Sequence, residues 1–165
     1  MKNKKMLTVY LVLFCFVLIA IYSINKVNSI NTVDKLITRL EKAINTGNVK
    51  DIINLYPEYY HDTLSEWISQ AKVDEFNSKI GDIEIQITYN NTYESISTSK
   101  AIKENINKEF GIDINIEDYQ IILVSVTNDT DTIFEQTQLQ VVKIKNKYYL
   151  YAEYYQGDLI QCFIE

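Results

Sequence analysis

The feature that most constrains this chain is an uncharged, mostly apolar run near its start. After the opening MKNKK, no charged residue occurs from Met6 to Ile24, a run of 19 residues. A helix needs about 20 apolar residues to cross a bilayer. The alternative, a cleaved signal peptide, has an apolar region of only about 7 to 15 residues followed by a small-residue cleavage site. We therefore expect a flank at 1–5, a transmembrane anchor at 6–24, a linker at 25–30 and one domain at 31–165.

The charges on either side of this run indicate its orientation. Lys2, Lys4 and Lys5 precede it, and only Lys26 follows closely. Lysines that flank a first transmembrane segment tend to remain in the cytoplasm. The pattern predicts a single-pass protein of the cell membrane that contacts the lipid bilayer through residues 6–24. Its N-terminus would be cytoplasmic and its C-terminal domain would lie outside.

This topology gives a direct prediction. Protease added to intact cells should remove the domain at 31–165, because the lysine-rich flank holds only residues 1–5 inside. The measurement is the loss of full-length chain on an immunoblot before lysis. Protection of the domain until the cells are lysed would show the opposite orientation.

The charge of the domain limits its partners. Beyond Lys26 the chain carries 12 basic and 22 acidic residues, a net charge of −10. Phosphate contacts need a basic surface, so we expect no nucleic-acid partner. The single arginine, 25 isoleucines and 15 asparagines are typical of an AT-rich bacterial genome. The expected setting is therefore a bacterial cell envelope.

No residue pattern in the sequence indicates a catalytic site, a metal site or a cofactor site. The chain has four glycines and lacks a phosphate-binding loop, a nucleophile elbow and a Cys-x-x-Cys pair. His61 is the only histidine, and we interpret it as a solvated loop or cap residue. The stretch NDTDT at 128–132 lacks the glycine and closing glutamate of a calcium loop and predicts a hairpin turn. Cys15 lies in the apolar run, so Cys162 has no disulfide partner and is expected to be a buried thiol.

Helical periodicity dominates the first half of the domain. Apolar residues recur on one face over residues 33–44, with Thr32 or Asn31 as cap and a stop at Gly47. A second helix is expected over 49–56, and a third over 63–80 with a capping box at Thr63 and Glu66 and an apolar side made by Leu64, Trp67, Ile68 and Ala71. A fourth is expected over about 98–110.

The second half has the alternation of strands. Ile83, Ile85, Ile87 and Tyr89 are expected on one buried face. Further strands follow at YQIILVSVT, at LQVVKIK and at YYLYAEYY, the last two joined by a tight turn at Asn146-Lys147. The order predicts an α+β domain in which amphipathic helices pack on a curved, mostly antiparallel sheet.

Two stretches carry a resemblance to a known family. LEKAINTGNVKDIINLYPEYY, together with VVKIKNKYYL near the end, resembles the opening helices and closing hairpin of nuclear-transport-factor-two-like domains. The likeness spans about residues 31–155 and is greatest for small secreted or membrane-anchored bacterial members of unknown function. It implies a cone-shaped α+β fold and no particular activity.

Five tyrosines between residues 148 and 155 are the most conspicuous local feature. On a strand, Tyr149, Tyr151 and Tyr155 share one face, while Tyr148 and Tyr154 share the other. We expect Tyr149 and Tyr151 to pack in the core, with 149 opposite 144 and 151 opposite 142. Tyr148 and Tyr154 are then the candidates to face a partner or ligand.

The sequence favours a binding or interaction module of the envelope, with an envelope protein or a small apolar ligand as its partner. Catalysis is not expected, because no acid and base are visibly paired. The alternatives are an isomerase- or hydrolase-like enzyme with its site in the cone, and a purely structural role within a larger complex.

Overall fold

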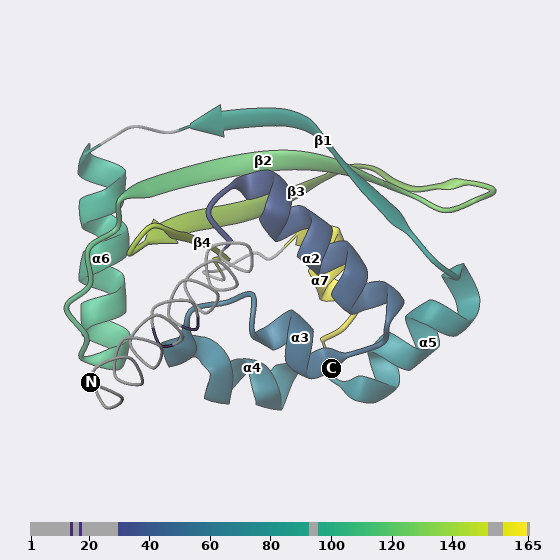
Figure 1. Cartoon of the computed structure of the whole chain (residues 1–165), viewed down its shortest axis with the longest axis horizontal. Helices are drawn as coiled ribbons and strands as arrows, with labels where there is room; N and C mark the ends of the chain where they lie inside the picture. Colours follow the sequence, from purple (N-terminus) through teal and green to yellow (C-terminus); the bar gives the residue numbers. More distant parts are fainter. Residues whose placement is uncertain (1–13, 15–16, 18–29, 93–95, 152–156, 165) are drawn as a thin grey trace, which may run out of the picture.

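The computed structural model describes Phe14, Val17 and residues 30–92, 96–151 and 157–164. Helices occupy the first part of the described domain, followed by a strand, a helix, three more strands and a short closing helix (Figure 1). The four strands form one antiparallel sheet in the order β1-β2-β3-β4. The predicted α+β class is therefore confirmed.

The first two helices begin where their caps predict. α2 spans Val33–Asn45, and the Thr32 hydroxyl accepts a hydrogen bond from the Lys35 amide. α3 spans Val49–Ile53 and is capped in the same way by Asn48. Between them Gly47 has φ of 63°, a left-handed conformation that glycine adopts without a steric penalty. A single turn of 3₁₀ helix, η1 at Glu58–Tyr60, follows Pro57.

The expected third helix is two helices. α4 spans His61–Trp67 and α5 spans Gln70–Ile80. The chain is extended at Ile68, which pairs with Ile164 in an isolated antiparallel bridge, while the Ser69 amide donates to the Phe163 carbonyl. This long-range pairing interrupts the helix, so Trp67 and Ala71 are exposed instead of buried. The capping box at Thr63 and Glu66 was also wrong, because α4 already begins at His61.

The sheet comprises β1 at Glu84–Thr92, β2 at Asp118–Thr127, β3 at Thr132–Ile144 and β4 at Lys147–Leu150. Between β1 and β2 lies α6 at Ile96–Phe110, close to the predicted fourth helix. Ile83 and Ile85 are buried as expected. A register shift between Ile87 and Tyr89 turns the following residues to the other face, so Tyr89 is 55% exposed.

The closing hairpin turns one residue earlier than predicted. Ile144 pairs with Lys147 and Val142 with Tyr149. The turn residues are Lys145 and Asn146, with φ of 50° and 61°, as a two-residue turn between twisted strands requires. The expected pairs 144 with 149 and 142 with 151 were therefore wrong. The error is two residues along the partner strand, so Tyr148 and Tyr149 keep their predicted faces.

Helices cover the sheet in two places. α2 and the closing helix α7 at Gly157–Gln161 lie against the sheet, and α6 stands across the ends of the strands (Figure 1). The Asn45 side chain fixes α2 to the start of β1, because its amide donates to the Ile83 carbonyl and its oxygen accepts from the Ile83 amide. The outer edge of β4 is covered too. The Tyr148 amide donates to the Ile30 carbonyl and the Leu150 amide to the Leu55 carbonyl.

The expected anchor falls almost wholly outside the described residues. Of residues 6–24, only Phe14 and Val17 are described, and both are helical and exposed. Within the described ranges, no helix combines the length and the apolar character needed to cross a bilayer. The anchor and the cone-like closure of the sheet both stay predictions.

Candidate functional site

Five aromatic rings connect η1, α6 and the sheet. Tyr59 and Tyr60 of η1 lie 4.8 Å apart between ring centroids, and Phe110 at the end of α6 lies 5.1 Å and 4.9 Å from them. Tyr151 continues the cluster, 6.1 Å from Tyr60 and 6.4 Å from Tyr119 of β2. Tilted and edge-on rings at these distances attract one another beyond their burial. The cluster gives a rigid wall at this end of the domain.

A cavity of about 750 Å³ adjoins this cluster. We call it the aromatic pocket. Its apolar lining comes from three segments: Pro57 and Tyr59; Ile112 and Ile114; Ile144 and Tyr149. Its polar lining is mostly acidic and comprises Glu58, Asp113, Asn115, Glu117 and Lys145. Apolar walls with a few polar groups are typical of small-molecule sites.

Tyr59 lines the aromatic pocket with its side chain and carries a buried polar atom. Its hydroxyl is buried and has no hydrogen-bond partner among the described residues. Burial raises the pKa of this hydroxyl well above its ordinary value, and the neighbouring Tyr60, Glu109 and Tyr149 raise it further. The group therefore stays protonated at physiological pH. A buried polar group without a partner costs about 1 to 3 kcal/mol.

Tyr149 also lines the aromatic pocket and is only half-buried, although it was predicted to lie in the core. Its pKa is raised, first by burial and second by the charge of Glu58. The Lys147 ammonium lies 4.4 Å from its ring centroid, a cation–π distance that restrains the ring. Tyr151 is buried as predicted.

Tyr148, the first candidate from the sequence, is half-buried on the other face of the hairpin. Its hydroxyl donates to Asp118 at 3.0 Å, and Gln120 donates to the same carboxylate. The pKa of Tyr148 is raised by burial and by Asp118. Its hydroxyl thus already has a partner within the chain. Tyr154, the second candidate, lies outside the described residues.

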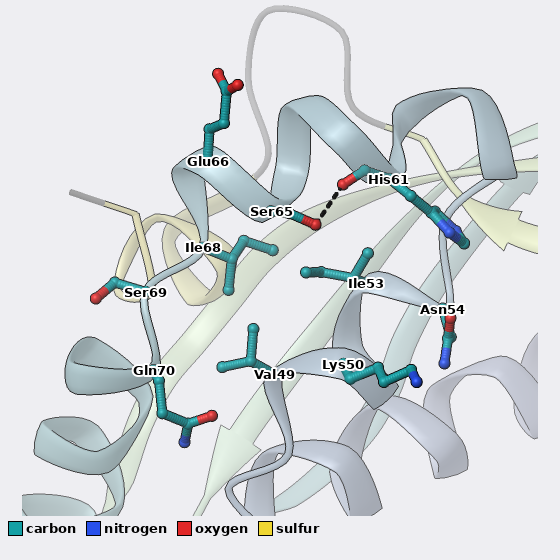
Figure 2. Close-up of a pocket in the computed structure, with 10 residues that line it drawn as sticks. All are labelled: Val49, Lys50, Ile53, Asn54, His61, Ser65, Glu66, Ile68, Ser69 and Gln70. Carbon is teal, nitrogen blue, oxygen red and sulfur yellow. Dashed lines mark hydrogen bonds between the residues drawn. The ribbon is translucent and has the colours of Figure 1, made fainter.

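A second cavity of about 750 Å³ contains His61 (Figure 2). His61 is half-buried at the start of α4 and is the C-cap of η1, the cap role being one of the two that were expected; its Nε2 lies 2.9 Å from the Tyr56 carbonyl oxygen. The Ser65 hydroxyl donates to the backbone carbonyl of His61, not to its ring. Glu66 is exposed and points away from the other labelled side chains. Among the described residues, this cavity therefore brings no carboxylate to the imidazole.

Two further expectations concern ligands for metals and the last cysteine. Asn128 accepts hydrogen bonds from the amides of Thr130 and Asp131, which gives the predicted turn between β2 and β3. No cluster of three or more His, Cys, Asp or Glu that could hold a metal ion occurs in the part of the chain that the structure describes. Cys162 is half-buried, less enclosed than expected.

No family model, curated protein or solved structure matches this chain. The likeness to nuclear-transport-factor-two-like domains therefore stays a prediction from LEKAINTGNVKDIINLYPEYY and VVKIKNKYYL.

The aromatic pocket was not predicted, although the sequence held a signal for part of it. Ile112, Ile114 and Ile116 alternate with polar residues directly after α6, as in a strand with one apolar face. This segment is not a strand, and its first two isoleucines line the pocket while Ile116 is buried. Nothing local indicates that η1 and the β3–β4 hairpin meet there, because that meeting depends on the tertiary fold.

Proposed function

We propose that this protein is a membrane-anchored, extracytoplasmic binding module of the bacterial cell envelope whose aromatic pocket takes a small, largely apolar ligand. The observation that carries the proposal is the cavity of about 750 Å³, whose walls include the rings of Tyr59 and Tyr149 and the isoleucines at 112, 114 and 144. A ligand with an aromatic or alicyclic body and one hydrogen-bonding atom matches these walls. The acidic lining disfavours an anionic ligand.

The anchored location rests on the sequence together with the position of Ile30. The apolar run ends at Ile24, and Ile30 already bonds to β4. Six residues span at most about 20 Å, so the domain would be held close to the membrane surface. Catalysis is not part of the proposal, because no acid and base are paired among the described residues of either large cavity.

The pocket gives a prediction that can be read residue by residue. The full chain, labelled with 3-fluorotyrosine and kept in neutral detergent, is titrated with indole as a neutral aromatic probe. The ¹⁹F signals of Tyr59 and Tyr149 should shift together, because both rings line the aromatic pocket. Tyr→Phe variants assign the signals. Tyr149→Ala should weaken indole binding by about three- to tenfold, the value of one aromatic contact.

Tyr89 is the matched control, since its side chain is 55% exposed and does not line the aromatic pocket. Its signal reports unspecific effects of indole and detergent, and Tyr89→Ala should leave the affinity unchanged. Shifts confined to Tyr56, whose carbonyl lies beside His61, would move the site to the histidine cavity and would favour the enzyme alternative. Equal shifts at every tyrosine would contradict the proposal.

A further inference from the structure

A smaller cavity of about 410 Å³ concentrates positive charge on this acidic chain. It is lined by Arg39 and Lys42 of α2 and by Lys147 of β4, with Asp51 as its only acidic lining residue. We call it the cationic cavity. Three of the chain's 16 basic residues therefore surround a single small space.

The fold places these three side chains together in two ways. Arg39 and Lys42 are three residues apart on the exposed side of α2, so they are neighbours on the helix surface. Lys147 is the first residue of β4, and the Tyr149 ring fixes its ammonium at 4.4 Å. The cavity wall between them includes Ile30, whose carbonyl bonds to the edge of β4. All three residues stand on regular structure, so the fold fixes their backbone positions.

Asp51 is the one carboxylate among the residues that line the cationic cavity. One oxygen of Asp51 accepts from the Asn48 side chain at 2.9 Å, which holds it at the start of α3. Neither Lys42 nor Lys147 forms an ion pair with any residue that the structure describes. The pKa of Lys147 is lowered, first by burial and second by repulsion from Arg39. An anion between these two groups would remove the repulsion.

We propose that the cationic cavity binds the phosphate group of a phosphate-bearing molecule, with Arg39, Lys42 and Lys147 as its ligands. A guanidinium donates two parallel hydrogen bonds to a phosphate, and lysine ammonium groups add point charges. Asn54, which also lines the cavity, supplies an amide donor. This site is separate from the aromatic pocket and does not depend on the function proposed for it.

Two kinds of molecule could supply the phosphate group. One is a soluble phosphate ester. The other is the headgroup of an anionic lipid, which the cavity would meet if the anchor at 6–24 holds Ile30 within about 20 Å of the bilayer. The two sources are distinguished by testing the same residues with a dissolved anion and with a lipid surface.

The test measures how fast each lysine is acetylated by a water-soluble ester, with mass spectrometry to identify the acetylated residues. The full chain in neutral detergent is labelled with and without inorganic pyrophosphate, at ionic strength matched with sodium chloride. A bound anion shields Lys147 and raises its pKa, so its labelling rate should fall several-fold, and that of Lys42 should fall with it. Lys72 and Lys79, which pair with Glu75, are internal controls whose rates should not change.

The lipid arm uses the full chain in nanodiscs of phosphatidylcholine alone or with phosphatidylglycerol. Protection of Lys42 and Lys147 by pyrophosphate supports the site with a soluble ligand. Protection only by phosphatidylglycerol supports it with a headgroup. Unchanged labelling in both arms would overturn the proposal.

Arg39→Gln provides a second readout. Without any anion, this change should slow the labelling of Lys147, because the pKa of its ammonium rises once the repulsion is gone. It should also weaken anion protection by about tenfold, the effect of losing one charge-assisted hydrogen bond. Lys79→Gln has the same change in charge and should alter neither result. Full anion protection in Arg39→Gln would exclude Arg39 from the site.

Discussion

Replacing Tyr151 by alanine should lower the free energy of unfolding by about 3 to 5 kcal/mol, the usual cost of removing a buried aromatic ring. Tyr151 is 3% exposed and joins the ring of Tyr60 on η1 to that of Tyr119 on β2. Its loss would open a cavity where the helical and β parts of the domain meet. Since small domains are stable by about 5 to 15 kcal/mol, the variant should be close to unfolded.

Tyr148→Ala is the matched control for Tyr151→Ala, because it removes the same side chain three residues earlier in the chain. Tyr148 is half-buried, so its removal should cost less, about 1 to 2 kcal/mol, through the lost contact with Asp118. Urea melts of the fragment that begins at Ser29 would measure both variants. A larger loss for Tyr148→Ala would mean that the two faces of the hairpin are assigned the wrong way round.

Phe163→Ala should cost a similar amount, about 3 to 5 kcal/mol, although the residue is two positions from the end of the chain. Its side chain is 0% exposed and meets Phe76 of α5 edge-on at 5.2 Å. Its carbonyl accepts the Ser69 amide beside the Ile68–Ile164 bridge. The variant should therefore loosen α5 as well as the C-terminal segment.

Hydrogen exchange of the same fragment would locate this effect, with faster exchange expected over α5 and at the Ser69 amide. Trp67→Ala is the control, since Trp67 is a large aromatic residue of the same region that is 44% exposed. It should cost less than about 1 kcal/mol. Equal losses for Phe163→Ala and Trp67→Ala would mean that the C-terminal segment does not dock as described.

Local chemistry predicted those elements whose limits are set within a few residues. Thr32 and Asn48 cap α2 and α3 because each side chain accepts from an amide three residues on. Gly111 ends α6 with φ of 66°. The NDTDT turn follows from the hydrogen bonds of Asn128 to its own neighbours. Each of these depends on contacts that the sequence itself brings together.

The elements that were wrong depend on distant contacts. α4 and α5 separate at Ile68 because Ile164, almost 100 residues later, pairs with it. The face change at Tyr89 follows from a bulge in its pairing with β2. The hairpin register was predicted wrongly because Lys145 takes a positive φ in the turn, a conformation for which lysine gives no sequence signal. The spacing of apolar residues along the sequence does not show which distant segments will pair.

The candidate site was missed for the same reason. Tyr148 and Tyr149 are adjacent and similar in sequence, yet one hydroxyl bonds within the sheet while the other ring lines a cavity. What separates them is the presence of Pro57, Tyr59, Ile112 and Ile114 on one side only. The alternation of residues along the strand places the two tyrosines on opposite faces, but only the tertiary fold shows which of these faces borders a cavity.

The bond between the Tyr148 amide and the Ile30 carbonyl has a mechanical consequence. Tension applied to the chain ahead of Ile30 acts first on this single bond at the edge of β4, because the Leu150–Leu55 bond lies beyond α2 and α3 in the chain. A single edge bond resists force far less than a row of bonds loaded together. A domain tethered through its N-terminus would therefore yield first at β4, close to Lys147 and Tyr149, so that load on the tether would reach both cavities before the rest of the sheet.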